Sequence, residues 1–160
     1  MKSLFIILLS ITMSITAEAQ STTTHFNAEQ KAVLATVEKM VAAFEKKDID
    51  GIMATYETNA IVMFEPGVPL TGHDVLRKAF SQAVNINPQY QFHGHEVFIS
   101  GNIATHITPW DMVGTLPDGS RIEESGLSVA ILRKQADGSW LMIQDNPHGQ
   151  FLLKSKQANN

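Results

Sequence analysis

Residues 110–149 read WDMVGTLPDGSRIEESGLSVAILRKQADGSWLMIQDNPHG, and this stretch decides the fold class of the 160-residue chain. Short turn-forming triplets interrupt its extended runs and the run just upstream: Ser100-Gly101-Asn102, Pro117-Asp118-Gly119 and Ala136-Asp137-Gly138. Connectors this short join neighbouring antiparallel strands, so the sequence predicts an antiparallel meander. The predicted strands span residues 91–99, 103–115, 121–133 and 139–146.

The sequence before the meander has helical periodicity instead. Asn27 and Gln30 form an approximate capping box, and apolar residues then recur at helical spacing as far as Phe44. Asp48 is placed to cap a second, shorter helix, which we expect to carry Tyr56. This part of the chain therefore predicts one long amphipathic helix followed by a short one.

A short apolar strand, residues 59–64, comes next and is halted by the turn that contains Pro66-Gly67. Thr71 and Asp74 form another approximate capping box, ahead of a third helix with an apolar stripe. Helices first and a meander second is the pattern of an α+β fold, with the helices packed on one face of a curved sheet.

The N-terminus has the three parts of a secretory signal peptide. Lys2 supplies a positive charge, residues 4–15 are largely apolar, and Ala-Glu-Ala at 17–19 is a small-x-small cleavage site. The apolar run is about 12 residues, short of the roughly 20 that a membrane-spanning helix needs; an uncleaved anchor is the alternative. We expect cleavage after Ala19 and export to the periplasm or the medium.

The remaining chain has the size of one domain. We expect a flexible leader at residues 20–26, the domain at 27–150 and a tail at 151–160. The chain has no cysteine, so its stability must come from the core rather than from disulfides. The net charge is −4 and the basic residues form no cluster, which argues against nucleic-acid binding. After the signal peptide no apolar segment is long enough to span a membrane.

The order of elements resembles the nuclear-transport-factor-2-like superfamily, and two stretches sharpen the match. Residues 44–80, FEKKDIDGIMATYETNAIVMFEPGVPLTGHDVLRKAF, resemble the opening of ketosteroid isomerases and SnoaL-like proteins. Residues 110–149 resemble the ketosteroid-isomerase-homologue branch of SnoaL-like proteins, above all in the DG turn, the LRKQ-DGSW turn and the closing DNP-G. The resemblance implies three N-terminal helices on a strongly curved, mostly antiparallel sheet, forming a cone with an internal pocket. Enzymes and plain binding proteins share this architecture.

Glu65 is the first candidate catalytic residue. It precedes Pro66, where ketosteroid isomerases are expected to carry an Asp-Pro general base. A carboxylate in an apolar pocket has a raised pKa and becomes a usable base near neutrality. The alternative is an ordinary exposed Glu-Pro-Gly turn.

The sequence lacks a hydrogen-bond donor at the position where ketosteroid isomerases carry one. The resemblance places the tyrosine donor of ketosteroid isomerases in the first helix, and the matching residue here is Met40, which cannot donate a hydrogen bond. Tyr56 is the remaining candidate, lining the cavity from another side; a core tyrosine with a satisfied hydroxyl is the alternative. Met40 argues against steroid isomerisation by the known arrangement.

The histidines form alternating sets on two predicted strands. His93 and His95 share one sheet face if their segment is regular, and His106 and Trp110 share a face of the next strand. A His-x-His pattern raises the question of a metal, but no clear third and fourth ligand accompanies it. We therefore expect no metal site, and we take His106 as a candidate ligand-binding residue.

Strict alternation along the last predicted strand places Trp140, Gln144 and Asn146 on one face and Asp145 on the other. Trp110 and Trp140 are candidate apolar walls of the pocket, and Gln144 and Asn146 are candidate polar groups in it. The alternative for the tryptophans is a place in the core. For Asp145 we expect a local hydrogen-bonding role near the turn.

The leading interpretation is an exported SnoaL-like domain, homodimeric through its sheet, whose cavity takes a small, largely apolar molecule. If it is an enzyme, Glu65 abstracts or relays a proton, and Tyr56, His106 or Gln144 donates to the developing oxyanion. The reaction would be an isomerisation or another acid–base step on a carbonyl compound, without a cofactor. The alternative is a non-catalytic binding or interaction domain of the cell envelope.

Overall fold

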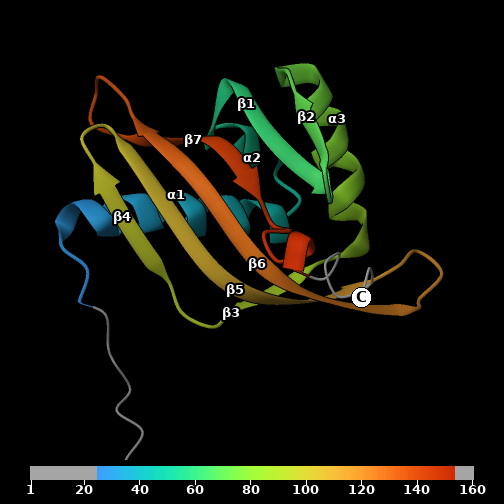
Figure 1. Ribbon diagram of the computed structural model, residues 1–160. Coiled ribbons are helices and arrows are strands. Elements are labelled where there is room, and N and C mark those ends of the chain that lie inside the picture. The colour runs from blue at the N-terminus through green and yellow to red at the C-terminus, as the bar shows by residue number, and fades with distance from the viewer. Residues whose placement is uncertain (1–24, 154–160) are drawn as a thin grey trace, which may run out of the picture.

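The computed structural model describes residues 25–153, and the expected signal peptide, most of the leader and the end of the tail lie outside them. In chain order the elements are α1 (Ala28–Glu45), α2 (Ile49–Met53), β1 (Tyr56–Glu65), β2 (Val68–Thr71), α3 (His73–Ala83), the 3-10 turn η1 (Val84–Ile86), β3 (Gln89–Phe92), β4 (Glu96–Ser100), β5 (Ile103–Thr115), β6 (Arg121–Lys134) and β7 (Trp140–Asn146). The helices precede most of a curved sheet and pack on it, as the α+β prediction requires (Figure 1).

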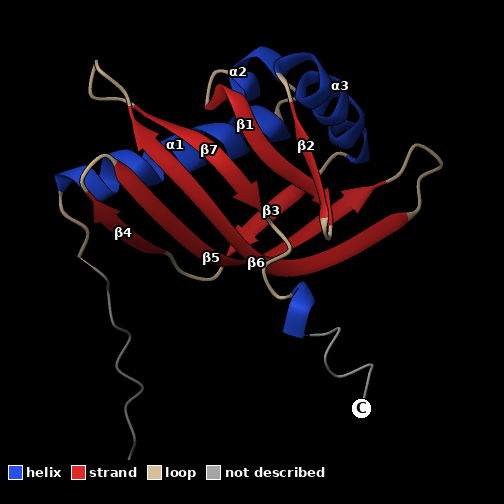
Figure 2. Cartoon of the chain, turned by 45° about the horizontal axis from the view of Figure 1, so that its top comes forward, coloured by secondary structure: helices blue, strands red, loops and turns tan. Residues whose placement is uncertain are grey.

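Within residues 25–153 the strands form one seven-stranded sheet in the order β2-β1-β7-β6-β5-β3, and β4 also pairs with β5. The β1–β7 pairing is parallel, and the other pairings in this part of the chain are antiparallel. Helix α1 packs across β4, β5 and β7, while α3 packs against β1 and β2. The helices therefore cover one face of the sheet (Figure 2).

Two of the predicted helix caps are confirmed. Asn27 and Gln30 form a reciprocal capping box at the start of α1, and the Asp48 side chain caps α2. The third cap, Thr71 with Asp74, is wrong: α3 has no side-chain cap, because Thr71 ends β2, a strand that the sequence did not predict. None of the helices between residues 25 and 153 is long and apolar enough to cross a membrane.

The strand predicted at 91–99 is divided into β3 and β4. Gly94, with φ of 115°, lies in the connector, and both strands still pair with β5. A left-handed φ of this kind favours glycine and ends the regular extended run. Because the connector is irregular, His93 and His95 do not share one strand face as expected.

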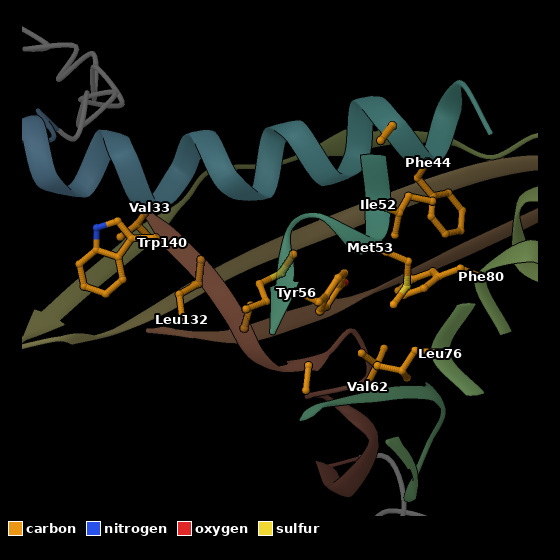
Figure 3. Close-up of a cluster of buried hydrophobic side chains, with 14 of the residues drawn as sticks. Val33, Phe44, Ile52, Met53, Tyr56, Val62, Leu76, Phe80, Leu132 and Trp140 are labelled. Carbon is orange, nitrogen blue, oxygen red and sulfur yellow. The ribbon is translucent and has the colours of Figure 1, made fainter. Parts of the chain in front are cut away.

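The buried side chains form a cluster between the helices and the inner face of the sheet (Figure 3). Trp140 lies at the same end of this cluster as Val33 and Leu132, whereas Phe44 and Phe80 lie at the other end. The candidate site is at the Phe44 and Phe80 end.

Candidate functional site

A cavity of about 210 Å³ lies between the helices and the inner face of the sheet. Among the described residues that line it, seven are aromatic: Phe44, Tyr56, Phe64, Phe80, Tyr90, Phe92 and Trp110. Phe64 packs edge to face on Phe80 with ring centroids 4.8 Å apart, and Tyr90 packs edge to face on Trp110 with centroids 5.9 Å apart. The wall is thus largely apolar and built from mutually packed rings.

A hydrogen-bonded pair of buried side chains, Tyr56 and Asp145, is the polar centre of this cavity. The Tyr56 hydroxyl donates to Oδ2 of Asp145 at 2.7 Å, and both residues line the cavity. Asp145 is only 8% exposed. Among the described residues no hydrogen bond reaches its other oxygen, Oδ1. The cavity therefore contains a carboxyl oxygen without a protein partner.

Burial controls the protonation of both members of the pair. Desolvation raises the pKa of Asp145, and the hydrogen bond from Tyr56 and the nearby His148 oppose that rise. Burial also raises the pKa of Tyr56, and the Asp145 carboxylate adds to the effect. Tyr56 is consequently a neutral hydrogen-bond donor at any physiological pH.

A β-bulge brings Asp145 into the cavity. Two consecutive residues of β6 pair with Met142 and Gln144, so Ile143 is an extra residue on β7. Alternation shifts by one position there, and the residues of β7 that line the cavity are Met142 and Asp145. The predicted placement of Gln144 and Asn146 in the pocket is therefore wrong, because strict alternation does not hold along this strand.

The two candidate tryptophans have different surroundings. Trp110 lines the cavity, and its indole N–H donates to the carbonyl of Pro147 at 3.1 Å. Gly126 faces it on β6, where a Cβ atom would lie 2.8 Å from the indole ring, so only glycine leaves room for this ring position. Trp140 is buried in the core and does not line the cavity, which corrects its expected role as a pocket wall.

Glu65 lies outside the cavity. It is the last residue of β1, it is exposed, and it sits in the hairpin to β2, although the preceding Phe64 lines the cavity. The expected buried base at this position is not present, because the hairpin keeps the carboxylate in solvent. Tyr56 does line the cavity, but it begins β1 and is not part of the second helix.

The histidines form two separate pairs. His106 is 0% exposed, and its Nε2 lies 3.0 Å from Nδ1 of His95. His106 does not line the cavity, which corrects its expected role as a ligand-binding residue. Within the described chain its own Nδ1 has no hydrogen-bond partner. Burial, with a smaller contribution from His95, lowers the pKa of His106 to about 4. His93 is exposed and lies 2.7 Å from Asp111. No group of three His, Asp or Glu side chains within residues 25–153 is placed to hold a metal ion.

Asp145 and Tyr90 are the site residues that sequence reasoning missed. Tyr90 on β3 lines the cavity, and burial raises the pKa of its hydroxyl, with further contributions from Asp145, Glu124 and Glu45. The closing DNP-G motif contains Asp145, but this motif indicates only the fold. It does not indicate whether the Asp145 side chain faces the cavity.

The sequence profile of the SnoaL-like domain family matches residues 37–141. The chain belongs to this family. Asp145 lies four residues beyond the end of the matched stretch. No curated protein matches the sequence of this SnoaL-like chain.

Solved structures share the fold of this SnoaL-like chain. A ketosteroid isomerase-like protein from Erwinia carotovora is 22% identical, with a TM-score of 0.65 over 75% of this chain and 95% of that one. A nuclear transport factor 2-like superfamily protein from Salmonella enterica is 10% identical, with a TM-score of 0.68 over 76% and 92%. At these identities the likeness confirms the nuclear-transport-factor-2-like architecture and says nothing about chemistry.

Proposed function

We propose that this SnoaL-like domain binds a small, largely apolar molecule in its cavity. The aromatic wall around about 210 Å³ is the observation that carries the proposal. Small-molecule sites combine apolar walls with a few polar groups that fix orientation. Here the free Oδ1 of Asp145 and the cavity-lining Tyr90 supply such groups.

We propose further that the domain is exported and forms a homodimer through its sheet. The charged, apolar and small-x-small parts of residues 1–19 support export. Exposed apolar side chains on three different strands of the sheet support the dimer, because an interface across this face would remove them from water. These are Ile61, Phe98 and Val113, with Phe98 58% exposed.

Native mass spectrometry of the gently purified protein tests these proposals together. We expect a polypeptide that begins at Gln20, a dimer, and a retained small-molecule adduct. Ala83→Phe, which fills the cavity from α3, should lose the adduct, whereas Ala42→Phe at an exposed site on α1 should keep it. A chain that begins at Met1, a monomer, or an adduct retained by Ala83→Phe would contradict export, the dimer or the cavity site respectively.

Acid–base catalysis on a carbonyl compound is a second candidate function, and the Tyr56–Asp145 pair favours it. A buried carboxyl with a raised pKa is suited to act as a general base. The hydroxyl of Tyr90, which also lines the cavity, is suited to stabilise a developing oxyanion. In this candidate mechanism Asp145 takes the role that the sequence suggested for Glu65.

If the domain catalyses this chemistry, it should accelerate exchange of the α-hydrogens of a small aryl ketone such as 4-phenyl-2-butanone in D₂O, as followed by NMR. Asp145→Asn should reduce the acceleration by about 10²–10⁴-fold, the usual contribution of a general base. Glu65→Gln, which alters an exposed carboxylate outside the cavity, should leave it unchanged. Absence of acceleration by the wild-type protein would remove the catalytic candidate and leave binding.

A further inference from the structure

We propose that the ligand of the cavity is a cation: an apolar, aromatic-sized amine, protonated or quaternary, whose nitrogen lies against Asp145 within the aromatic wall. This inference rests on the proposed binding function and adds the chemical class of the molecule. It is carried by the charges around the cavity, by the unpaired carboxyl oxygen inside it, and by the rings that surround that oxygen.

Within the described part of the chain, the acidic side chains around the cavity form no ion pair with a lysine or an arginine. Asp145 and Glu124 line the cavity, and Glu45 accepts a hydrogen bond from the backbone N–H of Tyr90 at 3.2 Å. No lysine or arginine is among the described lining residues. The ion pairs formed within residues 25–153 involve other acids and leave these three out. An anionic ligand would meet uncompensated negative charge, whereas a cation would neutralise it.

His148 is the basic side chain that the described wall does contain. Its Nε2 donates to the carbonyl of Phe64 at 3.2 Å. The N–H of a neutral imidazole is sufficient for this bond, so the contact does not require a second positive charge beside Asp145. Among the described residues no hydrogen bond joins His148 to Asp145, so Oδ1 is open to a ligand cation.

The carboxyl itself is incompletely satisfied. Tyr56 donates to Oδ2 of Asp145, and Oδ1 has no hydrogen bond from the described chain. A buried carboxylate without a counter-charge is unfavourable, and it either takes up a proton or pairs with a cation. A ligand ammonium group at Oδ1 would supply both the missing hydrogen bond and the missing charge.

The rings next to this carboxyl suit a cation as well. Tyr56 packs against Phe80 with ring centroids 5.3 Å apart, and Tyr90 packs against Trp110. These four side chains line the cavity together with Asp145. The faces of Tyr and Trp rings attract cations and bind the apolar body of a ligand equally well. The Asp145 carboxylate and the aromatic wall therefore both favour a cationic amine with an apolar body.

A matched set of probes separates charge from shape. We expect titration calorimetry at pH 7 and low salt to rank 2-phenylethylamine, a cation, about tenfold tighter than neutral 2-phenylethanol. The anion phenylacetate, with the same ring, should bind weakest of the three. Equal or tighter binding of the alcohol overturns the inference while the proposed binding function stands. Binding of none of the probes overturns both.

Two variants locate the preference. Asp145→Asn keeps the shape of the side chain and removes its charge, so the amine should lose its advantage while the alcohol still binds. Glu65→Gln removes a carboxylate outside the cavity and should keep the full preference. A preference that persists in Asp145→Asn overturns the assignment to this residue. The wild-type ranking decides the charge question even if Asp145→Asn does not fold.

Discussion

Replacing Trp140 by alanine is expected to lower the free energy of unfolding by about 3–5 kcal/mol and to leave the ligand affinity of the folded protein unchanged. The side chain is 2% exposed and belongs to the core cluster, so its removal leaves a void that neighbouring side chains fill only in part. Trp140 does not line the cavity, and therefore no ligand contact is lost. Urea unfolding gives the first quantity, and titration of the folded variant with 2-phenylethylamine gives the second.

Trp140→Phe is the matched control. The indole N–H of Trp140 has no hydrogen-bond partner among the described residues, so phenylalanine loses no hydrogen bond and retains most of the apolar volume. We expect this change to reduce stability by less than about 1.5 kcal/mol. A folded Trp140→Ala protein with clearly weakened ligand binding would restore the role in the pocket that the sequence suggested.

Acidification from pH 7 to pH 4 is expected to lower the free energy of unfolding by about 3 kcal/mol through His106 alone. The pKa of His106 is lowered by burial to about 4 in the folded protein, against about 6.5 in the unfolded chain. The unfolded state therefore binds more protons between these values. The stabilisation is complete above pH 6.5 and is lost as the pH falls toward 4.

His106→Gln isolates this effect, and His73→Gln, which removes an exposed histidine, is its control. His95 faces His106, and burial lowers the pKa of His95 as well, whereas the charge of Glu38 on α1 opposes the shift of His95. Asp145 acts in the opposite direction, because its pKa is raised and its burial is better tolerated at low pH. Urea unfolding at pH 7 and pH 4 should show a pH difference smaller by about 3 kcal/mol in His106→Gln. An unchanged difference would show that His106 does not titrate in this range.

Local signals in the sequence were sufficient for the architecture. Turn triplets such as Pro117-Asp118-Gly119 depend on a few neighbouring residues, and the three strands predicted after residue 102 are present within one residue of their predicted bounds. The capping box at Asn27 is local in the same way. Strand β2 was missed because it is only four residues long and contains Pro69, a residue that argues against a strand.

The site was predicted less well, because it depends on contacts between distant strands. Tyr56 lines the cavity, although it lies at the start of β1 and not on the second helix to which the sequence assigned it. Whether the Asp145 side chain faces the cavity depends on the β-bulge in the β6–β7 pairing, and no residue of β7 indicates that bulge in the sequence. Glu65 is exposed because it lies in the β1–β2 hairpin. This hairpin was not predicted, since β2 was not recognised in the sequence.

The extra residue on β7 has a consequence for how such chains diverge. Because Ile143 shifts the alternation, the chemical character of the cavity depends on the number of residues in the strand as well as on their identity. Insertion of one more residue before Gln144 would turn Gln144 toward the cavity in place of Asp145, whereas deletion of Ile143 would restore regular alternation and leave Asp145 facing inward. Homologues with the same closing motif can therefore differ in specificity, and the spacing before the motif is the feature to compare between them.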